Sequence, residues 1–141
     1  LCALKQRSLE SGLILLAARI EQFAQLLTQV TASEYQRLNE SWPGAVTWLV
    51  KHNGVAPEWI VGKHPNVALR VTAHLVAAQL CARTGILVST SANVHGSNPA
   101  TSMQEIEQDF ADKVDYIYPG ELGGRAQVSQ IIELSSNKQY R

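Results

Sequence analysis

A run of small hydrogen-bonding side chains follows one expected strand directly. The segment 86–90 begins apolar, turns polar at Ser89, and continues as a polar loop to Asn98. In open α/β sheets, ligands bind beyond the carboxyl ends of strands, where hydroxyl and amide groups can hold a polar or phosphate-bearing ligand. We therefore expect a ligand-binding loop over 89–98, although an ordinary polar loop after a strand has the same composition.

The middle of the chain carries positive side chains without acidic ones. No Asp or Glu occurs between Glu58 and Glu105, although the whole protein is neutral, with 12 Lys+Arg and 12 Asp+Glu. This pattern predicts a local anion site rather than bulk attraction for nucleic acid, unless buried strands simply exclude charge there. Arg70, at the end of an expected strand, is the sharpest candidate because a guanidinium can fork onto a carboxylate or phosphate. The window holds these basic and imidazole side chains: Lys63, His64, Arg70, His74, Arg83 and His95.

Two further basic motifs lie outside this window. In an extended Lys5-Gln6-Arg7 segment, Lys5 and Arg7 would face the same side and could reach one phosphate chain. A solvated helix end is the plainer interpretation, because cations there interact favourably with the helix dipole. The turn Gly123-Gly124-Arg125 is first of all a loop, with an anion-binding nest as the alternative.

Several common active-site signatures do not occur in the sequence. There is no Gly-x-x-x-x-Gly-Lys-Ser/Thr loop, no Gly-x-Gly-x-x-Gly fingerprint and no Gly-x-Ser-x-Gly elbow. The four histidines and the two cysteines, Cys2 and Cys81, fit no zinc or redox spacing. We expect free thiols, a cytoplasmic location, no membrane segment and no metal centre built by side chains.

Strand-like and helix-like segments alternate along the 141 residues, and 45% of the residues are hydrophobic. The length and composition predict one α/β domain, 1–141, with a largely parallel or mixed sheet flanked by helices. The run 12–18 is continuously apolar and is expected to be a strand buried on both faces. The remaining expected strands are 46–50, 66–71, 86–90, 116–118 and 128–134. The expected helices cover 20–30, 33–39 behind Ser33, 72–84 behind Thr72, and a segment that starts at Ser102 with Glu105 at the capping-box position.

Eight short motifs occur in a fixed order across essentially the whole chain. They are Leu4-Lys5-Gln6-Arg7, Gly12-Leu13-Ile14-Leu15, Trp42-Pro43-Gly44-Ala45-Val46-Thr47, Val67-Ala68-Leu69-Arg70-Val71, Leu87-Val88-Ser89-Thr90-Ser91-Ala92-Asn93, Pro99-Ala100-Thr101, Pro119-Gly120-Glu121-Leu122-Gly123-Gly124-Arg125 and Ser129-Gln130-Ile131-Ile132. Together they resemble the YrdC/Sua5 family of threonylcarbamoyl-AMP synthases, in its short bacterial TsaC form. The family's Lys-x-Arg and Ser-x-Asn signature falls on Lys5/Arg7 and Ser91/Asn93.

The resemblance implies a YrdC-like fold with a twisted mixed sheet and a large positive cavity. It implies a nucleotidyltransferase that makes threonylcarbamoyl-AMP from L-threonine, bicarbonate and ATP, with Mg²⁺ bound to the phosphates and pyrophosphate released. The product would supply TsaD-, TsaB- and TsaE-type proteins that modify tRNA at the adenosine beside the anticodon. It also implies that this chain lacks the family's N-terminal portion, whose Thr-Glu-x-x-Tyr-Gly-Leu segment would lie before Leu1.

The resemblance assigns roles to nine residues. Lys5, Arg7, Ser91 and Asn93 are the implied catalytic residues and would hold the ATP phosphates. Asn66 and Arg141 match ATP-contacting positions, while Arg70, Ser89 and Ser129 would face threonine. Two alternatives stay open, namely an RNA- or tRNA-binding module and a catalytically impaired nucleotide-binding scaffold.

Overall fold

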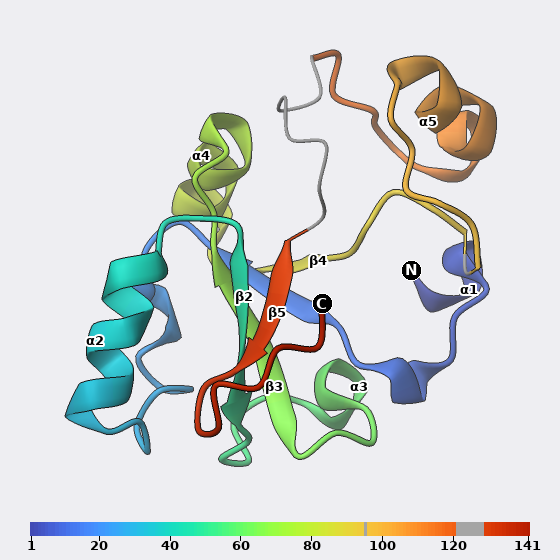
Figure 1. Ribbon diagram of the computed structural model, residues 1–141. Coiled ribbons are helices and arrows are strands. Elements are labelled where there is room, and N and C mark those ends of the chain that lie inside the picture. Colours follow the sequence, from blue (N-terminus) through green and yellow to red (C-terminus); the bar gives the residue numbers. More distant parts are fainter. Residues whose placement is uncertain (95, 121–128) are drawn as a thin grey trace.

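The computed structural model describes residues 1–94, 96–120 and 129–141 (Figure 1). His95, the Gly123-Gly124-Arg125 turn and position 128 of the last expected strand lie outside the described residues. The helices are α1 (Cys2–Lys5), α2 (Ala32–Ser41), α3 (Glu58–Val61), α4 (Leu75–Thr84) and α5 (Met103–Phe110). The strands are β1 (Ile14–Ala17), β2 (Val46–Lys51), β3 (Asn66–Val71), β4 (Leu87–Ser89) and β5 (Gln130–Glu133). Three short 3₁₀ segments are η1 (Leu9–Ser11), η2 (Ile20–Phe23) and η3 (Ala111–Lys113).

The five strands form one sheet in the order β4-β1-β3-β2-β5. The β1–β3 and β2–β5 pairs are parallel, whereas β1–β4 and β2–β3 are antiparallel. This confirms the predicted α/β class with a mixed sheet. In Figure 1, α2 and α4 lie to the left of the twisted sheet, and α1, α3 and α5 lie to its right.

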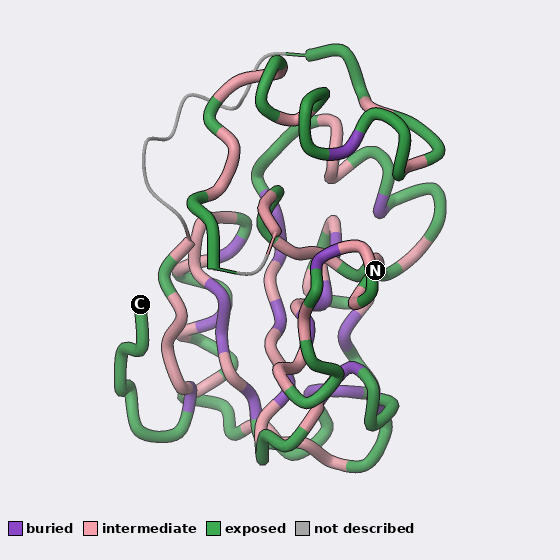
Figure 2. Tube along the Cα trace, turned by 90° about the vertical axis from the view of Figure 1, so that its right-hand side faces the viewer, coloured by how far each residue is buried: buried purple, intermediate pink, exposed green. Residues whose placement is uncertain are grey.

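The two faces of the sheet differ in burial. Along β3, Val67, Leu69 and Val71 are at most 1% exposed, while the alternate residues Asn66, Ala68 and Arg70 are half-buried. Figure 2 shows the same alternation of purple and pink along the strands. Because successive side chains in a strand point to opposite faces, one face of the sheet supplies the core and the other remains partly open.

The prediction that the strand at 12–18 is buried on both faces is therefore wrong. In β1, Leu15 and Ala17 are buried, but Ile14 and Leu16 are only half-buried. The sequence run is apolar throughout because the open face of β1 also carries aliphatic side chains. As described below, that face is the floor of a cavity.

The indole groups of Trp42 and Trp48 connect the end of α2 to the sheet through hydrogen bonds. Trp48 Nε1 donates to Ser41 Oγ at 2.8 Å, and Trp42 Nε1 donates to the Val46 carbonyl at the same distance. The Phe23 ring packs against Trp42 with centroids 6.0 Å apart. Each buried indole N–H is satisfied, so the rings contribute apolar burial without leaving an unpaired donor.

The capping residue predicted for one helix is confirmed, and the capping residues of two other helices differ from the prediction. Ser102 Oγ accepts from Glu105 N, which confirms the start of α5. The start of α2 is Thr31 rather than Ser33, because Thr31 and Glu34 form the reciprocal capping box. The start of α4 is His74 rather than Thr72, since the Thr72 hydroxyl is taken by His74 N and His74 Nδ1 accepts from Ala77 N.

Two other expected elements are wrong. The segment 20–30 forms only the short η2 followed by turns, in which amides bond to the carbonyl three residues back, as Leu26 N does to Phe23 O. Its apolar spacing was still informative, because Phe23, Leu26 and Leu27 are buried. The segment 116–118 has no strand, and Tyr116 and Tyr118 are exposed. Strand propensity reflects packing on a half-buried pleated surface, which this segment does not have.

Candidate active-site cavity

A cavity of about 580 Å³ lies over the open face of the sheet. Strand register places five of its lining residues in one row across all five strands. In sheet order the row is Ser89, Ile14, Ala68, Leu49 and Glu133. At about 4.8 Å between strands, this row spans about 19 Å from Ser89 to Glu133. The floor is thus an aliphatic strip with a hydroxyl at one end and a carboxylate at the other.

The α3 segment and η1 form a wall beside this floor. Leu13 N donates to Ile60 O at 2.7 Å, and Lys63 N donates to Glu10 O at 3.1 Å. Gly62 adopts φ +65°, and a Cβ there would overlap the Glu10 carbonyl, so this contact requires glycine. Lys63 also pairs with the Glu10 carboxylate at 2.6 Å. The segment between Glu58 and Glu105 contains no acidic residue, but in the folded protein the Glu10 carboxylate lies beside its Lys63.

A first polar corner of the cavity joins the N-terminal segment to the loop after β4. Lys5 Nζ donates to the Ser91 carbonyl and, at 3.4 Å, to Asn93 Oδ1, and Ser91 Oγ donates to the same Oδ1 at 2.5 Å. Lys5 is only 5% exposed. Burial, and secondarily repulsion from Arg7, lower the pKa of its ammonium.

Lys5 and Arg7 do not lie on one extended segment. Lys5 ends α1, and Gln6 then takes a left-handed conformation at φ 52°. This turn leaves Lys5 buried against the loop after β4, while Arg7 lines the cavity and donates to the Ser11 carbonyl at 2.9 Å. The motif is thus a helix end, as the plainer interpretation held, but Lys5 is not solvated.

A second polar corner lies where β3 ends and β5 begins. Arg70 Nε donates to the Gly44 carbonyl at 2.9 Å, and Gly44 N donates to Val71 O. Arg141 Nε donates to the Ser129 carbonyl at 3.1 Å, and one Arg141 terminal nitrogen lies 3.4 Å from Ser129 Oγ. Two guanidinium groups and one hydroxyl therefore line this part of the cavity, which suits a carboxylate or phosphate.

A third corner has the opposite charge. Asn66 Nδ2 donates to Glu133 Oε1 at 2.9 Å, and Ser136 Oγ donates to Glu133 Oε2. These two hydrogen bonds, with Ser136 the larger cause, lower the pKa of the Glu133 carboxyl. The carboxylate therefore stays ionised at neutral pH, and it forms the acidic end of the cavity floor.

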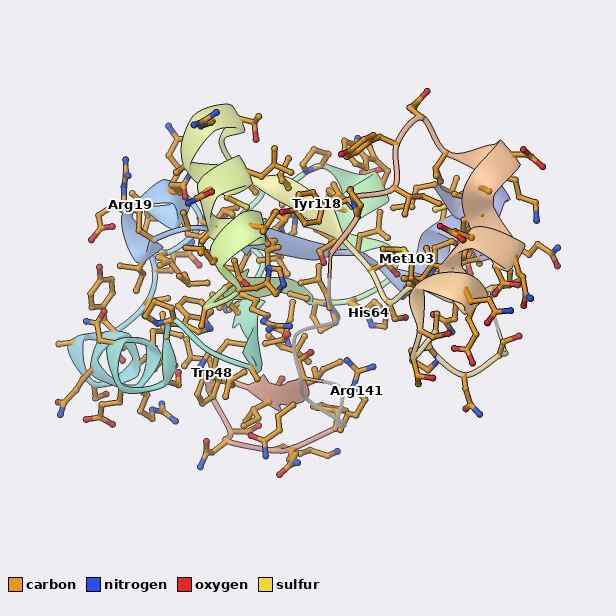
Figure 3. All side chains as sticks on the ribbon, turned by 90° about the horizontal axis from the view of Figure 1, so that it is seen from above. Arg19, Trp48, His64, Met103, Tyr118 and Arg141 are labelled. Atoms are coloured by element: carbon orange, nitrogen blue, oxygen red, sulfur yellow. The ribbon has the colours of Figure 1, made fainter. Side chains whose placement is uncertain are left out.

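Seven of the nine sequence-predicted site residues line this one cavity, namely Arg7, Asn66, Arg70, Ser89, Ser91, Ser129 and Arg141. Lys5 and Asn93 are not in its lining and contact it through Ser91. The cavity lies across the sheet face rather than only beyond the strand ends, where it had been expected. In Figure 3, His64 and Arg141 lie to the right of β2, and Trp48 lies to its left, toward α2.

Sequence reasoning missed Glu133 and Tyr140, which also line the cavity, and it named His64 only as a member of the cationic window. Glu133 could have been found, because Ser129, Ile131 and Glu133 alternate along the expected last strand and must share a face. His64 and Tyr140 come from loops, whose placement depends on tertiary contacts. In the described part of the chain, no group of three or more His, Cys, Asp or Glu side chains could hold a metal ion. No helix there has the length and apolar character that a membrane crossing needs.

A family model for Sua5/YciO/YrdC, described as telomere recombination, matches residues 1–141. The chain belongs to this family. The resemblance seen in the motifs is therefore confirmed, and the family gives a common frame for the fold and the cavity.

Individual family members match along the whole chain. The threonylcarbamoyl-AMP synthase of Stutzerimonas stutzeri (strain A1501) is 49% identical over 141 residues, which cover all of this chain and 76% of that protein. The synthase of Cellvibrio japonicus (strain Ueda107) is 45% identical over 142 residues and is covered to 75%.

Solved structures of the family have the same fold. P. abyssi Sua5 complexed with L-threonine superposes with a TM-score of 0.86 and 27% identity, covering 94% of this chain and 39% of that one. This chain thus spans about two fifths of the Sua5 chain. E. coli YciO, at 21% identity and a TM-score of 0.80 over 98% of this chain and 68% of that one, shares the fold.

Proposed function

We propose that this protein makes threonylcarbamoyl-AMP from L-threonine, bicarbonate and ATP and releases pyrophosphate. The observation that carries the proposal is the convergence of seven family-implied residues on one cavity. That cavity combines guanidinium, hydroxyl and amide groups in a volume typical of ligand sites. The names of the two bacterial relatives and the threonine complex of Sua5 support the same chemistry.

The proposed reaction has two bond-forming steps. The threonine ammonium first loses a proton, and the resulting amine attacks the carbon of bicarbonate to form a carbamate with release of one water. A carbamate oxygen then attacks the α-phosphorus of ATP, and the bond from that phosphorus to the bridging oxygen breaks as pyrophosphate leaves. No covalent intermediate with the protein is required, so the protein's task is to position two anions and to offset their repulsion.

The corners of the cavity suit different parts of this task. Arg7 and the Ser91 hydroxyl would bind the phosphates. Lys5 and Asn93 would hold the Ser91 loop in place, and the Lys5 ammonium would add positive charge behind it. Arg70, Ser89 and Ser129 would bind threonine, whose carboxylate suits the Arg70 guanidinium. Fixed donors of this kind stabilise charge that develops in the transition state without reorganising.

Further parts of the proposal concern the substrate-borne ion and the partners. Mg²⁺ would enter with ATP and be held mainly by phosphate oxygens and water, as is usual for this ion. The product would be handed to TsaD-, TsaB- and TsaE-type proteins, which transfer the threonylcarbamoyl group to tRNA. The enzyme would accordingly work where tRNA is modified, in the cytoplasm.

Pyrophosphate release from ATP tests the proposal, with threonine and bicarbonate each omitted in turn. Release should require both, and Arg7→Ala should lower kcat/KM for ATP about a hundredfold. Arg83→Ala, which removes an exposed guanidinium from α4, is the matched control and should leave the rate unchanged. Release without co-substrates, or an unaffected Arg7→Ala enzyme, would contradict the proposal. Salt-dependent tRNA binding without turnover would instead support the RNA-binding alternative.

A further inference from the structure

We propose that Glu133 is a positioning residue that fixes the Asn66 amide so that the cavity selects adenine by its 6-amino group. This inference rests on the proposed function in taking ATP as the nucleotide. It concerns the third corner of the cavity, to which only Asn66 had been assigned, and it adds a residue and a specificity that the proposed reaction does not require.

Charge decides which end of a nucleotide can lie at this corner. Glu133 is an ionised carboxylate whose pKa is lowered by Ser136 and Asn66 and, to a smaller extent, by the charge of Lys138, and a triphosphate placed against this carboxylate would be repelled. Arg7 and the Ser91 loop lie near the opposite end of the register row, about 19 Å away by strand spacing. The Arg141 guanidinium contacts Ser129, four residues and roughly 13 Å before Glu133 at the rise of a strand, while the Arg141 backbone carbonyl accepts from Ile131 N. The uncharged base is therefore the part of ATP that fits beside Glu133.

The surfaces next to Glu133 suit a flat apolar ring. Leu49 is its register partner on β2, and Ile131 precedes it by two residues on the same face of β5. Tyr140 also lines the cavity, and its backbone N–H donates to the Ile131 carbonyl at 2.8 Å. A base lying over these side chains would present its edge to Asn66 and Glu133.

The orientation of the Asn66 amide follows from the chemistry of its partner. A carboxylate can only accept hydrogen bonds, so the Asn66 nitrogen must face Glu133 and the amide oxygen must point away from it. An amide oxygen accepts from the 6-amino group of adenine but opposes the 6-oxo group of hypoxanthine or guanine. Without Glu133, the amide can turn over and present its nitrogen, which would accommodate the oxo group.

Inosine triphosphate tests this edge of the base, because it carries an oxo group and a hydrogen on N1 where adenine carries the amine and an unprotonated N1. The affinities for ATP and inosine triphosphate are measured by calorimetry, and kcat/KM is measured with each nucleotide. The variants are Glu133→Ala, Glu133→Gln, Asn66→Ala and the Asn66→Ala/Glu133→Ala double variant. Glu107→Ala on the exposed side of α5 is the matched control. Ser136→Ala, which loosens Glu133 from outside the cavity lining, serves if Glu133→Ala does not fold.

We expect the unmodified protein to favour ATP about tenfold or more, a preference of the size of one hydrogen bond. Glu133→Ala should abolish most of this preference, whereas Glu133→Gln should keep it, since the Gln carbonyl still accepts from Asn66. In the Asn66→Ala background, removing Glu133 should change the preference no further. Ser136→Ala should weaken the preference partially.

Three results would overturn the inference. These are equal affinity of the unmodified protein for the two nucleotides, a full preference in Glu133→Ala, and an effect of Glu133→Ala that persists without Asn66. Failure of the proposed function looks different, because pyrophosphate release would then be missing while the ATP preference and its loss in Glu133→Ala remained measurable by calorimetry.

Discussion

The two faces of strand β3 have opposite tasks although they share one backbone. Val67, Leu69 and Val71 are sealed in the core, while Asn66, Ala68 and Arg70 line the cavity. The side chains on the core face are all apolar. On the cavity face, the two end residues Asn66 and Arg70 are polar, and the small apolar Ala68 lies between them. Substitutions at adjacent residues of β3 should therefore have different effects: one should alter stability and the next should alter ligand binding.

Truncating the core face should have the largest effect. Leu69→Ala removes a fully buried side chain and should lower the free energy of unfolding by about 3 kcal/mol, measured by urea denaturation. Leu49→Ala makes the same change on the cavity face and should cost about 1 kcal/mol, because Leu49 is only half-buried. Equal costs for the two variants would break the distinction between the faces.

Truncating the cavity face should give the converse result. Under the proposed function, Arg70→Ala should lower kcat/KM for threonine about a hundredfold, because it removes a carboxylate-binding guanidinium. The free energy of unfolding should change by less than about 1 kcal/mol. Arg70→Lys should recover only part of the activity, since an ammonium cannot form the planar fork. A large loss of stability with unchanged kinetics would reverse the assignment.

Gly44 lies between the two faces of the sheet, close to the Ser41 carbonyl of α2 on one side and hydrogen-bonded to the Arg70 side chain on the other. A Cβ at this position would overlap the Ser41 carbonyl oxygen, so Gly44→Ala should cost about 2 kcal/mol of stability. It should also lower activity, because the Gly44 carbonyl accepts from Arg70. In the Arg70→Ala background the activity loss should shrink, whereas the stability loss should persist. Fully additive activity losses would argue against a shared mechanism.

The smallest expected effect comes from Glu34, which lies on neither face. Hydrogen bonds from the Thr31 backbone and hydroxyl lower the pKa of this carboxyl below its ordinary value of 4.5. A depressed pKa stabilises the folded protein above the unfolded pKa, and that contribution is lost as the pH falls through the folded value. After discounting for solvent screening at this exposed site, Glu34→Gln should therefore cost at most about 0.5 kcal/mol at pH 7, and the cost should shrink as the pH falls through the depressed pKa, by thermal unfolding. A difference independent of pH would contradict this linkage.

Much of the fold could be predicted because the deciding signals are local. The strand at 66–71 was predicted with its observed bounds, since its β-branched residues sit between a Pro and a Thr. Thr31 and Glu34 also match the capping-box spacing, so the observed start of α2 is encoded locally as well. The 20–30 segment is different, because its apolar residues reach the core through 3₁₀ turns that hydrophobic spacing does not distinguish from a helix.

The candidate site was predicted in its residues but not in its geometry. The order of the motifs predicts that Arg7, Arg70 and Ser91 belong to one site, and the described cavity contains all three. The sequence did not indicate that Glu10, from outside the acid-free window, pairs with Lys63. Nor did it indicate that Lys5 and Arg7 diverge at a left-handed Gln6. The Glu10–Lys63 pair depends on contact between distant segments, and the turn at Gln6 is a local helix end, and periodicity encodes neither of them.

The register row across the sheet has a consequence for how the protein can misfold. A shift of β5 by one residue against β2 would turn Glu133 toward the core and bring Ile132 to the cavity. Such a molecule would keep most of its backbone hydrogen bonds and remain compact, yet its binding floor would end in a methyl group instead of a charge. Specific activity per folded molecule, rather than yield of soluble protein, is therefore the proper measure of a correctly made preparation.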